Sequence, residues 1–348
     1  MDVLHPITVA ANTPRPQRQR SKAIWLSIIV PTYNGARFLR AALDSVASQV
    51  DDGVEVIAVD DGSTDSTPAI LRSYAKRLPL CIVSREHRGN WVANANYGLS
   101  IAKGEYISLL HQDDLWAPQR LAILKGMTSQ YPAAPMTLHP SWFIDVQGRK
   151  VGGWRPPFPT VSQELSGAMV FERLLVQNFI CVAAPLFRAE TVAKLGGLDE
   201  TLWYVADWDL WLKIASTGSI VYHPRPLVAF RVHSESQTWA RAGQVLELRR
   251  QYNVVLGRHL VPWEARPPTN PVVARVARYS VEVNLALAAR AHRKPVDVFR
   301  LFGAFIALGP MGWTRYLRDS RIGERVFSRW RAGLISRGKG YHDARDKA

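Results

Sequence analysis

The chain has 348 residues, a formal net charge of +15 and 47% hydrophobic residues, a composition that excludes disorder along the whole chain. Its two cysteines exclude a disulfide framework and a Cys-rich zinc site, and its longest charge-free apolar runs, of 14 residues, are shorter than the roughly 18 to 20 that span a bilayer. The charge is uneven, because residues 24–270 carry a net +2 and residues 271–348 a net +10, which predicts a nearly neutral body with a basic C-terminal extension.

The first 110 residues predict a lead followed by alternating strands and helices. Residues 1–23 contain three prolines and no apolar periodicity, so we expect a flexible lead and no secretory signal. Apolar runs predict buried strands, which alternate with helices that begin near Asn34, Thr67 and Asn90. The predicted strands are 26–30, 54–59, 80–83 and 106–110. This alternation predicts a parallel sheet that helices cover on both faces.

The rest of the chain predicts shorter strands and then a helical tail. Residues 132–159 are predicted to be rich in loops, with a strand over 136–144. Later strands are expected at 186–187, 220–222 and 227–232, and helices at 171–176, 191–195, 207–216, 273–287, 298–308 and 322–334. We therefore expect a lead over 1–23, a main domain over 24–262 and a helical basic extension over 271–340.

Polar clusters follow three of the predicted strands, at the point where each strand ends. They are Thr32-Tyr33-Asn34, Asp60-Asp61-Gly62-Ser63 and His111-Gln112-Asp113-Asp114. Ligands of parallel sheets bind outside the carboxyl ends of the strands. Asp-Gly-Ser-Thr-Asp is also good turn material. Two carboxylate pairs at one sheet edge are harder to explain as turns, because adjacent carboxylates need a cation or hydrogen-bond donors.

Two further side chains are candidates for chemistry. Asp207 begins an amphipathic helix among tryptophans, and apolar neighbours raise the pKa of a carboxyl and suit it to act as a base. A plain alternative is that Asp207 and Asp209 complement the helix dipole. His233 ends a strand, and a lone histidine is usually structural. Dinucleotide, P-loop, serine-hydrolase and HExxH zinc motifs are absent from the sequence.

Five segments in order resemble family 2 glycosyltransferases, between about residues 25 and 240. They are Ser27-Ile28-Ile29-Val30-Pro31-Thr32-Tyr33-Asn34, Val59 to Asp65, Asn96-Tyr97-Gly98 through Ile107, Gly196-Gly197-Leu198-Asp199-Glu200 through Leu210, and Arg231-Val232-His233. The resemblance implies an α/β GT-A fold, a Rossmann-like mixed sheet flanked by helices. It also implies an inverting, hexosyl-type transfer from a nucleotide-diphosphate sugar to a hydroxyl of a glycan or a lipid-linked acceptor.

The resemblance also assigns roles by motif position. Asp207 would be the catalytic base. A divalent metal, Mg²⁺ or Mn²⁺, would be held by Asp113, with His111 and His233 as further ligands. Thr32, Tyr33 and Asp61 would hold the nucleoside. The full set of implied donor-binding residues is Pro31, Thr32, Tyr33, Asn34, Asp60, Asp61, Arg88, Asn96, Gln112 and Asp114.

The sequence departs from the family pattern at three positions. His111 stands where the metal motif usually begins with Asp, Ala206 where Glu commonly precedes the base, and Ala95 where Arg is frequent, so that a phosphate contact would come from Arg88. His111 and Ala206 support an alternative, a non-catalytic relative that binds nucleotide sugars or glycans, whereas the retained Asp113 and Asp207 predict an active enzyme. A nucleic-acid-binding protein is supported by the net charge alone, and we expect no nucleic-acid partner.

The tail allows two interpretations. Arg315, Arg318, Arg321 and Arg325 interleave with Trp313, Tyr316 and Phe327. This pattern fits a small helical subdomain with a solvated basic face. It also fits attachment of residues 271–340 to an anionic membrane surface. With a lipid-linked acceptor in view, we expect a cytoplasmic protein, peripheral at the inner face of the membrane, in cell-surface polysaccharide or glycolipid synthesis.

Overall fold

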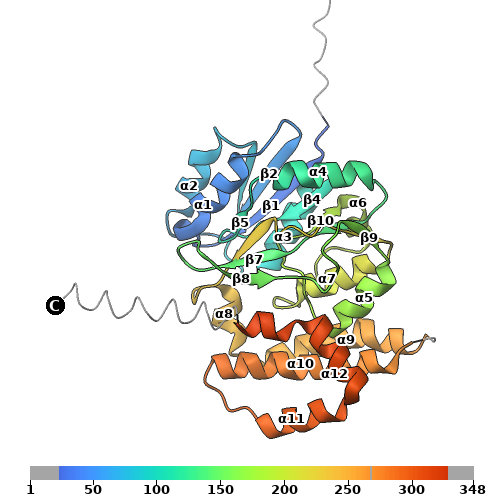
Figure 1. The fold of residues 1–348 in the computed structure, drawn as a ribbon. Coiled ribbons are helices and arrows are strands. Elements are labelled where there is room, and N and C mark those ends of the chain that lie inside the picture. Colours follow the sequence, from blue (N-terminus) through green and yellow to red (C-terminus); the bar gives the residue numbers. More distant parts are fainter. Residues whose placement is uncertain (1–22, 267–268, 328–348) are drawn as a thin grey trace, which may run out of the picture.

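The computed structural model describes residues 23–266 and 269–327 and contains two sheets and twelve α-helices in these residues (Figure 1). The larger sheet has eight strands in the order β3-β2-β1-β4-β10-β6-β11-β9, and the smaller has four in the order β5-β12-β7-β8. The strands are β1 (Leu26–Thr32), β2 (Val54–Asp60), β3 (Leu80–Ser84), β4 (Tyr106–Leu109), β5 (Leu115–Trp116), β6 (Met136–Leu138), β7 (Ser141–Ile144), β8 (Lys150–Trp154), β9 (Gln163–Leu165), β10 (Leu186–Arg188), β11 (Ile220–Tyr222) and β12 (Val228–Arg231).

The helices divide between those beside the sheets and those of the C-terminal part. They are α1 (Ala36–Ala47), α2 (Thr67–Tyr74), α3 (Trp91–Ile101), α4 (Arg120–Gln130), α5 (Gly167–Val176), α6 (Ala189–Lys194), α7 (Ala206–Ala215), α8 (Gln237–Ala242), α9 (Val245–Glu264), α10 (Pro271–Ala291), α11 (Val298–Ala307) and α12 (Gly309–Ser320). Residues 1–22 of the expected lead, and residues 328–334 of the helix predicted over 322–334, lie outside the described residues.

The first four strands confirm the predicted parallel arrangement. β2, β1 and β4 run parallel, and β3 joins β2 in the same direction, whereas β10 runs antiparallel to β4 and makes the sheet mixed. Every residue of β1 is buried. Ile29 belongs to one apolar cluster, with α3 and α7, and Ile28 and Val30 to another, with α1 and α2. Alternate side chains of β1 thus enter cores on opposite faces.

Close packing of α3 on β1 explains a glycine of the family-like sequence. A Cβ on Gly98 would lie 2.5 Å from Cγ2 of Ile29, so only glycine lets α3 approach the strand this closely. This contact seats the second half of α3 on the middle of β1.

The predicted single strand over 136–144 is wrong. The chain forms β6 in the larger sheet, breaks at His139 and Pro140, and continues as β7 in the smaller sheet. A proline in the middle of a strand removes a ladder donor, which favours the break. β12 then pairs in parallel with β7, so the smaller sheet brings the end of β12 beside the loop after β4.

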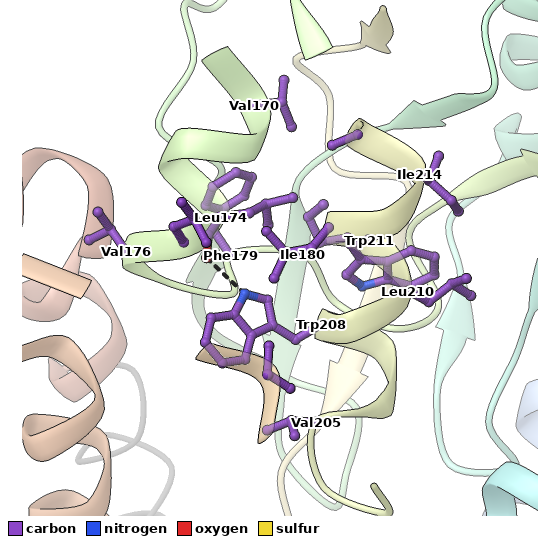
Figure 2. Close-up of a cluster of buried hydrophobic side chains, with 14 of the residues drawn as sticks. Val170, Leu174, Val176, Phe179, Ile180, Val205, Trp208, Leu210, Trp211 and Ile214 are labelled. Carbon is purple, nitrogen blue, oxygen red and sulfur yellow. Dashed lines mark hydrogen bonds between the residues drawn. The ribbon is translucent and has the colours of Figure 1, made fainter. Parts of the chain in front are cut away.

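The C-terminal helices share the main hydrophobic core. Val273, Val276 and Ala277 of α10 belong to the cluster that contains Trp208 of α7 and Leu174 of α5. Figure 2 shows α5 and α7 facing each other in this cluster, with Trp208 Nε1 donating to Leu174 O at 2.7 Å. Among the described residues no helix is both long enough and apolar enough to cross a bilayer.

The predicted tail helices over 273–287 and 298–308 are confirmed as α10 and α11, and residues 322–327 of the third are helical as well. The helices that were not predicted are α4, α8, α9 and α12. α12 begins with Gly309 at a φ of 69° and Pro310, which read as a helix break but form the first turn of a new helix. The arginines expected on an open basic face are largely engaged inside the protein: Arg315 pairs with Asp319 at 2.6 Å, and Arg325 is 8% exposed.

Candidate active site

The ends of β1 and β2 are joined through Asp60. Thr32 and Asp60 are register partners, and Thr32 Oγ1 donates to Asp60 Oδ1 at 3.0 Å. Ser63 donates to the same carboxylate through its backbone N–H at 3.1 Å and through its hydroxyl. Pro31 lies beyond Ile29, where the pairing of β1 with β4 ends, so its missing N–H costs no ladder bond. Asp60, 2% exposed, shapes the turn after β2.

Asn34 and Gln112 tie the loop after β1 to its two neighbours. Asn34 has a φ of 45°, and its Oδ1 accepts from Thr64 N at 2.8 Å in the loop after β2. Gln112, after β4, exchanges two 2.9 Å hydrogen bonds with the backbone of Tyr33. A Cβ on Gly35 would lie 2.1 Å from Gln112 Oε1, so any other residue there would displace the Gln112 amide from Tyr33. The three predicted clusters therefore form one connected edge.

Asp61 holds a further loop against this edge. Its two oxygens accept from the backbone N–H groups of Arg88 at 3.0 Å and Gly89 at 2.9 Å, and the carboxylate is 2% exposed. His87 Nδ1 lies 3.0 Å from Asp61 Oδ2, and its ring stacks on Tyr33 with centroids 4.1 Å apart. Arg88 contributes its backbone to this contact, while the residue itself is exposed.

Asp113 and His233 are brought together from residues 120 positions apart. Asp113 Oδ2 lies 2.9 Å from His233 Nε2, and the carboxylate is partly exposed. Buried Arg231 donates to Asp113 O at 2.8 Å and to Asp145 O at 2.7 Å, which fixes β12 beside the loop after β4. Burial would raise the pKa of Asp113, but the hydrogen bond from His233 and the nearby histidines hold that pKa below its usual value.

Asp114 differs from its neighbour. It is 1% exposed and accepts from the Arg231 backbone N–H at 3.0 Å. Burial, together with the charge of Asp113, raises the pKa of Asp114 well above its usual value. His111 packs edge-on against Trp91 with centroids 5.0 Å apart, and burial lowers the pKa of its imidazole.

Three polar atoms around Asp113 are buried without a hydrogen-bond partner in the described part of the chain. They are His111 Nε2, His233 Nδ1 and Asp114 Oδ2. Within that part no group of three or more His, Cys, Asp or Glu side chains converges as a complete metal cage. The pair Asp113 and His233 fits a divalent ion that takes its other ligands from water and substrate phosphates, as Mg²⁺ usually does.

Asp207 lies at the start of α7, half-buried against the helical side of the molecule. Asn178 Nδ2 donates to its Oδ2 at 3.1 Å, and the Trp208 backbone N–H donates to its Oδ1 at 2.7 Å. Burial nevertheless raises the pKa of Asp207 from 3.8 to about 6, because these hydrogen bonds offset only part of the desolvation. Desolvation thus acts on this carboxyl in the direction that its apolar sequence neighbours predict.

Sequence patterns did not identify Asn178, the partner of Asp207. Its neighbour Gln177 accepts at Oε1 from Ser280 Oγ at 3.1 Å and from Asn284 Nδ2 at 3.0 Å, both on α10. These contacts join the segment after α5 to a helix more than 100 residues later in the chain. The lone signal in the sequence is a Gln-Asn pair that interrupts an apolar run.

Asp209, the second acidic residue of α7, and Asn96, an expected donor-binding residue, both have structural partners. Asp209, 0% exposed, pairs with Lys213 at 2.7 Å and with Arg258 and His259 of α9 at 2.8 Å each. Burial would raise the pKa of Asp209, but these partners lower it to about 2. Asn96 uses its amide on Leu198, through hydrogen bonds of 2.9 Å and 3.0 Å, and so holds α3 to the loop before α7.

Comparison with known proteins agrees with this geometry. The model of the family described as glycosyl transferase family 2 matches residues 27–148. A glycosyltransferase of Rickettsia typhi is 30% identical over 230 residues, which are 66% of this chain and 71% of the relative. One of Rickettsia prowazekii is 30% identical over 223 residues, 64% of this chain and 68% of the relative. The chain belongs to glycosyltransferase family 2.

Solved structures show that this family member has the GT-A fold. Staphylococcus aureus TarS 1-349 in complex with UDP-GlcNAc has a TM-score of 0.57 at 17% identity, over 90% of this chain and 92% of that one. The mannosyltransferase PcManGT of Pyrobaculum calidifontis, in complex with GDP-Man and Mn²⁺, has a TM-score of 0.52 at 19% identity, over 88% and 86% of the two chains.

Proposed function

We propose that this family 2 glycosyltransferase moves a sugar, with inversion, from a nucleotide-diphosphate sugar to a hydroxyl of a glycan or lipid-linked acceptor. The observation that carries the proposal is Asp207, a half-buried carboxylate with a pKa of about 6 held by Asn178. A base works best when its pKa lies near the working pH, because it is then ionised and still accepts a proton readily.

The connected sheet edge is the proposed donor site. Thr32, Tyr33 and Asp61 would hold the nucleoside, with Asp60 in support and Pro31, Asn34, Gln112 and Asp114 shaping the surrounding loops. The exposed side chain of Arg88 would reach the diphosphate. Support comes from the relatives of the same fold, since TarS binds UDP and UDP-GlcNAc and PcManGT binds GDP-Man. A donor contact by Asn96 stays a prediction, because its amide already holds Leu198.

Asp113 and His233 are the proposed ligands of Mg²⁺ or Mn²⁺, with His111 as a neutral imidazole beside them. When bound, such an ion offsets negative charge on the leaving diphosphate. PcManGT is in complex with Mn²⁺, which supports a divalent ion here. Arg231, two residues before His233, would keep His233 beside Asp113 through its hydrogen bonds to Asp113 O and Asp145 O.

Asp207 would take the proton of the acceptor hydroxyl. As that oxygen forms its bond to the anomeric carbon, the bond from this carbon to the diphosphate oxygen breaks, and the nucleoside diphosphate leaves with the electron pair. One displacement inverts the anomeric centre and requires one base, unlike the carboxylate pair of a glycosidase. Trp208 would hold the Asp207 carboxylate in place through its backbone N–H.

We further propose that the reaction serves cell-surface polysaccharide or glycolipid synthesis at the cytoplasmic face of a membrane, with residues 271–340 in contact with an anionic lipid surface. The support is the net charge of +10 over residues 271–348 and the fit of that surface to a lipid-linked acceptor.

The test combines donor binding with turnover. A thermal-shift panel of nucleotide sugars with Mg²⁺ or Mn²⁺ would identify the donor, because a ligand that binds only the folded state raises its stability. Donor hydrolysis and transfer would then be measured for wild type, Asp207→Asn, Asp113→Ala and the exposed control Asp44→Asn. We expect loss of turnover in the first two variants and wild-type turnover in the control. Turnover by Asp207→Asn at the wild-type rate would contradict the base assignment, and a donor bound without turnover by wild type would favour the non-catalytic alternative.

A further inference from the structure

Helix α11 is apolar and exposed along its whole length. Nine of its ten residues are uncharged and apolar or glycine, Arg300 is the exception, and none is buried. Phe299 is 89% exposed, Val298 66%, Phe302 63% and Ile306 50%. A water-soluble surface rarely carries several large apolar side chains side by side, so this helix marks an interaction surface.

One edge of α11 is anchored to the protein through Phe305. Phe305 stacks on Trp313 of α12 with centroids 5.8 Å apart, and Trp313 Nε1 donates to Phe305 O at 2.6 Å. At 3.6 residues per turn, Phe302, Ile306 and Phe299 lie about 60°, 100° and 120° around the helix from Phe305, on the flank that the exposed fractions place toward solvent. Figure 1 shows α11 at the edge of the molecule, on the far side of α10 from the sheets. The apolar face is therefore held outward by packing.

Cations border this face. Arg293 and Lys294 lie exposed in the turn before α11, and Arg300 lies about 100° around the helix from Phe299. None of the three forms an ion pair within residues 23–266 and 269–327, in contrast to Arg315 and Arg318, which pair with Asp319. Long basic side chains beside an apolar face can place their charges among lipid headgroups while the apolar side chains enter the acyl boundary.

We propose that α11 docks this protein on an anionic lipid surface, with Val298, Phe299, Phe302 and Ile306 inserted and Arg293, Lys294 and Arg300 at the headgroups. This names the element and the lipid class for the membrane contact in the proposed function, and it rests on that part of it. Ten helical residues span about 15 Å, half of the hydrocarbon thickness of a bilayer, so the helix lies in the interface and does not cross it.

Charge favours lipid over a second copy of the chain as the occupant. A contact between the α11 helices of two copies would bring the net positive charge of Arg293, Lys294 and Arg300 from both copies to one interface. Like charges at an interface core oppose association. An anionic bilayer instead has negatively charged headgroups that attract these cations and a hydrocarbon layer that accepts the apolar side chains.

The experiment is co-sedimentation of the full chain with phosphatidylcholine vesicles, with and without phosphatidylglycerol. We expect binding to the anionic vesicles at low salt. Phe299→Ser with Phe302→Ser should lower this affinity by about tenfold or more, because two large apolar groups no longer leave water. Arg293→Gln with Lys294→Gln should lose most of the preference for phosphatidylglycerol. Val161→Ser, which changes an apolar side chain 57% exposed between β8 and β9, is the matched control and should bind as wild type.

Three results would overturn the proposal. They are no wild-type binding to anionic vesicles at low salt, equal binding by the Phe299→Ser, Phe302→Ser variant, and a wild-type dimer that this variant abolishes. Circular dichroism and thermal melting check that the variant folds. Donor hydrolysis without vesicles gives a separate readout, which we expect to be unchanged in the variant. If vesicle binding depends on α11 while no nucleotide sugar is turned over, the transfer proposal fails and the docking proposal stands.

Discussion

The sheet edge and the helical side of the site hold their carboxylates in different ways. At the sheet edge the loops after β1, β2 and β4 fasten one another, and both oxygens of Asp60 and of Asp61 accept hydrogen bonds. On the helical side Asp207 has two donors, Asn178 and the Trp208 N–H, which do not offset its desolvation. The first arrangement suits a rigid binding surface, and the second suits a group that exchanges a proton.

The same contrast recurs within α7. Asp209, two residues after Asp207, is buried but meets Lys213, Arg258 and His259, and its pKa falls to about 2. The pKa of Asp207 rises to about 6. Position on the helix therefore does not decide the protonation of these two groups. The number of cations and donors that reach each carboxylate does.

The largest expected effect follows from replacing Asp207. Asp207→Asn should lower transfer by about 10³-fold, as expected for loss of a general base. A raised pKa means that the folded state binds the proton more tightly than the unfolded state, so the ionised carboxylate lowers stability above pH 6. The variant should therefore melt at a higher temperature than wild type near pH 8 and at about the same temperature near pH 4. A transfer rate within tenfold of wild type would contradict the role of Asp207 as the group on the helical side that exchanges a proton.

Asp209→Asn is expected to act on stability. It leaves Lys213 and Arg258 without the buried carboxylate and should lower the free energy of unfolding by about 3 kcal/mol, as for broken buried ion pairs. The pKa of Asp209 is depressed, so its contribution is present above 3.8 and is lost as the pH falls toward about 2. Urea unfolding at neutral pH and near pH 2 measures both values. If Asp209→Asn lowers the free energy of unfolding equally at the two pH values, the ion pairs do not explain the effect.

Much of the sheet edge could be predicted because its determinants are local. Apolar runs define β1, β2 and β4, and the polar residues directly after them must lie at one edge of a parallel sheet. The helix of Asp207 was likewise predicted from its periodicity, and the tryptophans around it indicated a desolvated carboxyl.

The partners across the molecule could not be predicted in this way. His233 reaches Asp113 because β12 pairs with β7, and that pairing depends on the break at His139 and Pro140 that a single predicted strand concealed. Asn178 reaches Asp207 because Gln177 is held by α10, a contact without any local sequence signal. Arginines of the tail were expected on one open face, yet Asp319 pairs with Arg315 and Arg318, which leaves the apolar α11 as the exposed feature.

On the sheet-edge side, Asp61→Asn tests whether the loop over Tyr33 depends on the carboxylate. The amide can accept on one atom alone, so the N–H group of Arg88 or Gly89 loses its partner. We expect a loss of about 2 kcal/mol in unfolding free energy, the cost of one buried unsatisfied donor. The KM for the donor should rise about tenfold, which corresponds to about 1.4 kcal/mol of donor-binding free energy. The kcat should change less. A fall in kcat with KM unchanged would mean that Asp61 acts in the transfer step and not in donor binding.

The smallest effect is expected from Asn178→Ala, and it separates orientation of the base from stability. The Asn178 amide stabilises the ionised form of Asp207, so its loss should move the acid limb of the transfer rate above pH 6 and lower the rate at pH 7 by about threefold to tenfold. The rate near pH 9 should return close to wild type, because Asp207 is ionised in both proteins there. The control is Gln177→Ala, which removes the contacts to Ser280 and Asn284 but leaves the hydrogen bond to Asp207. It should lower the melting temperature and keep the acid limb in place. A deficit in Asn178→Ala that is the same at every pH would mean that Asn178 orients Asp207 without tuning its proton affinity.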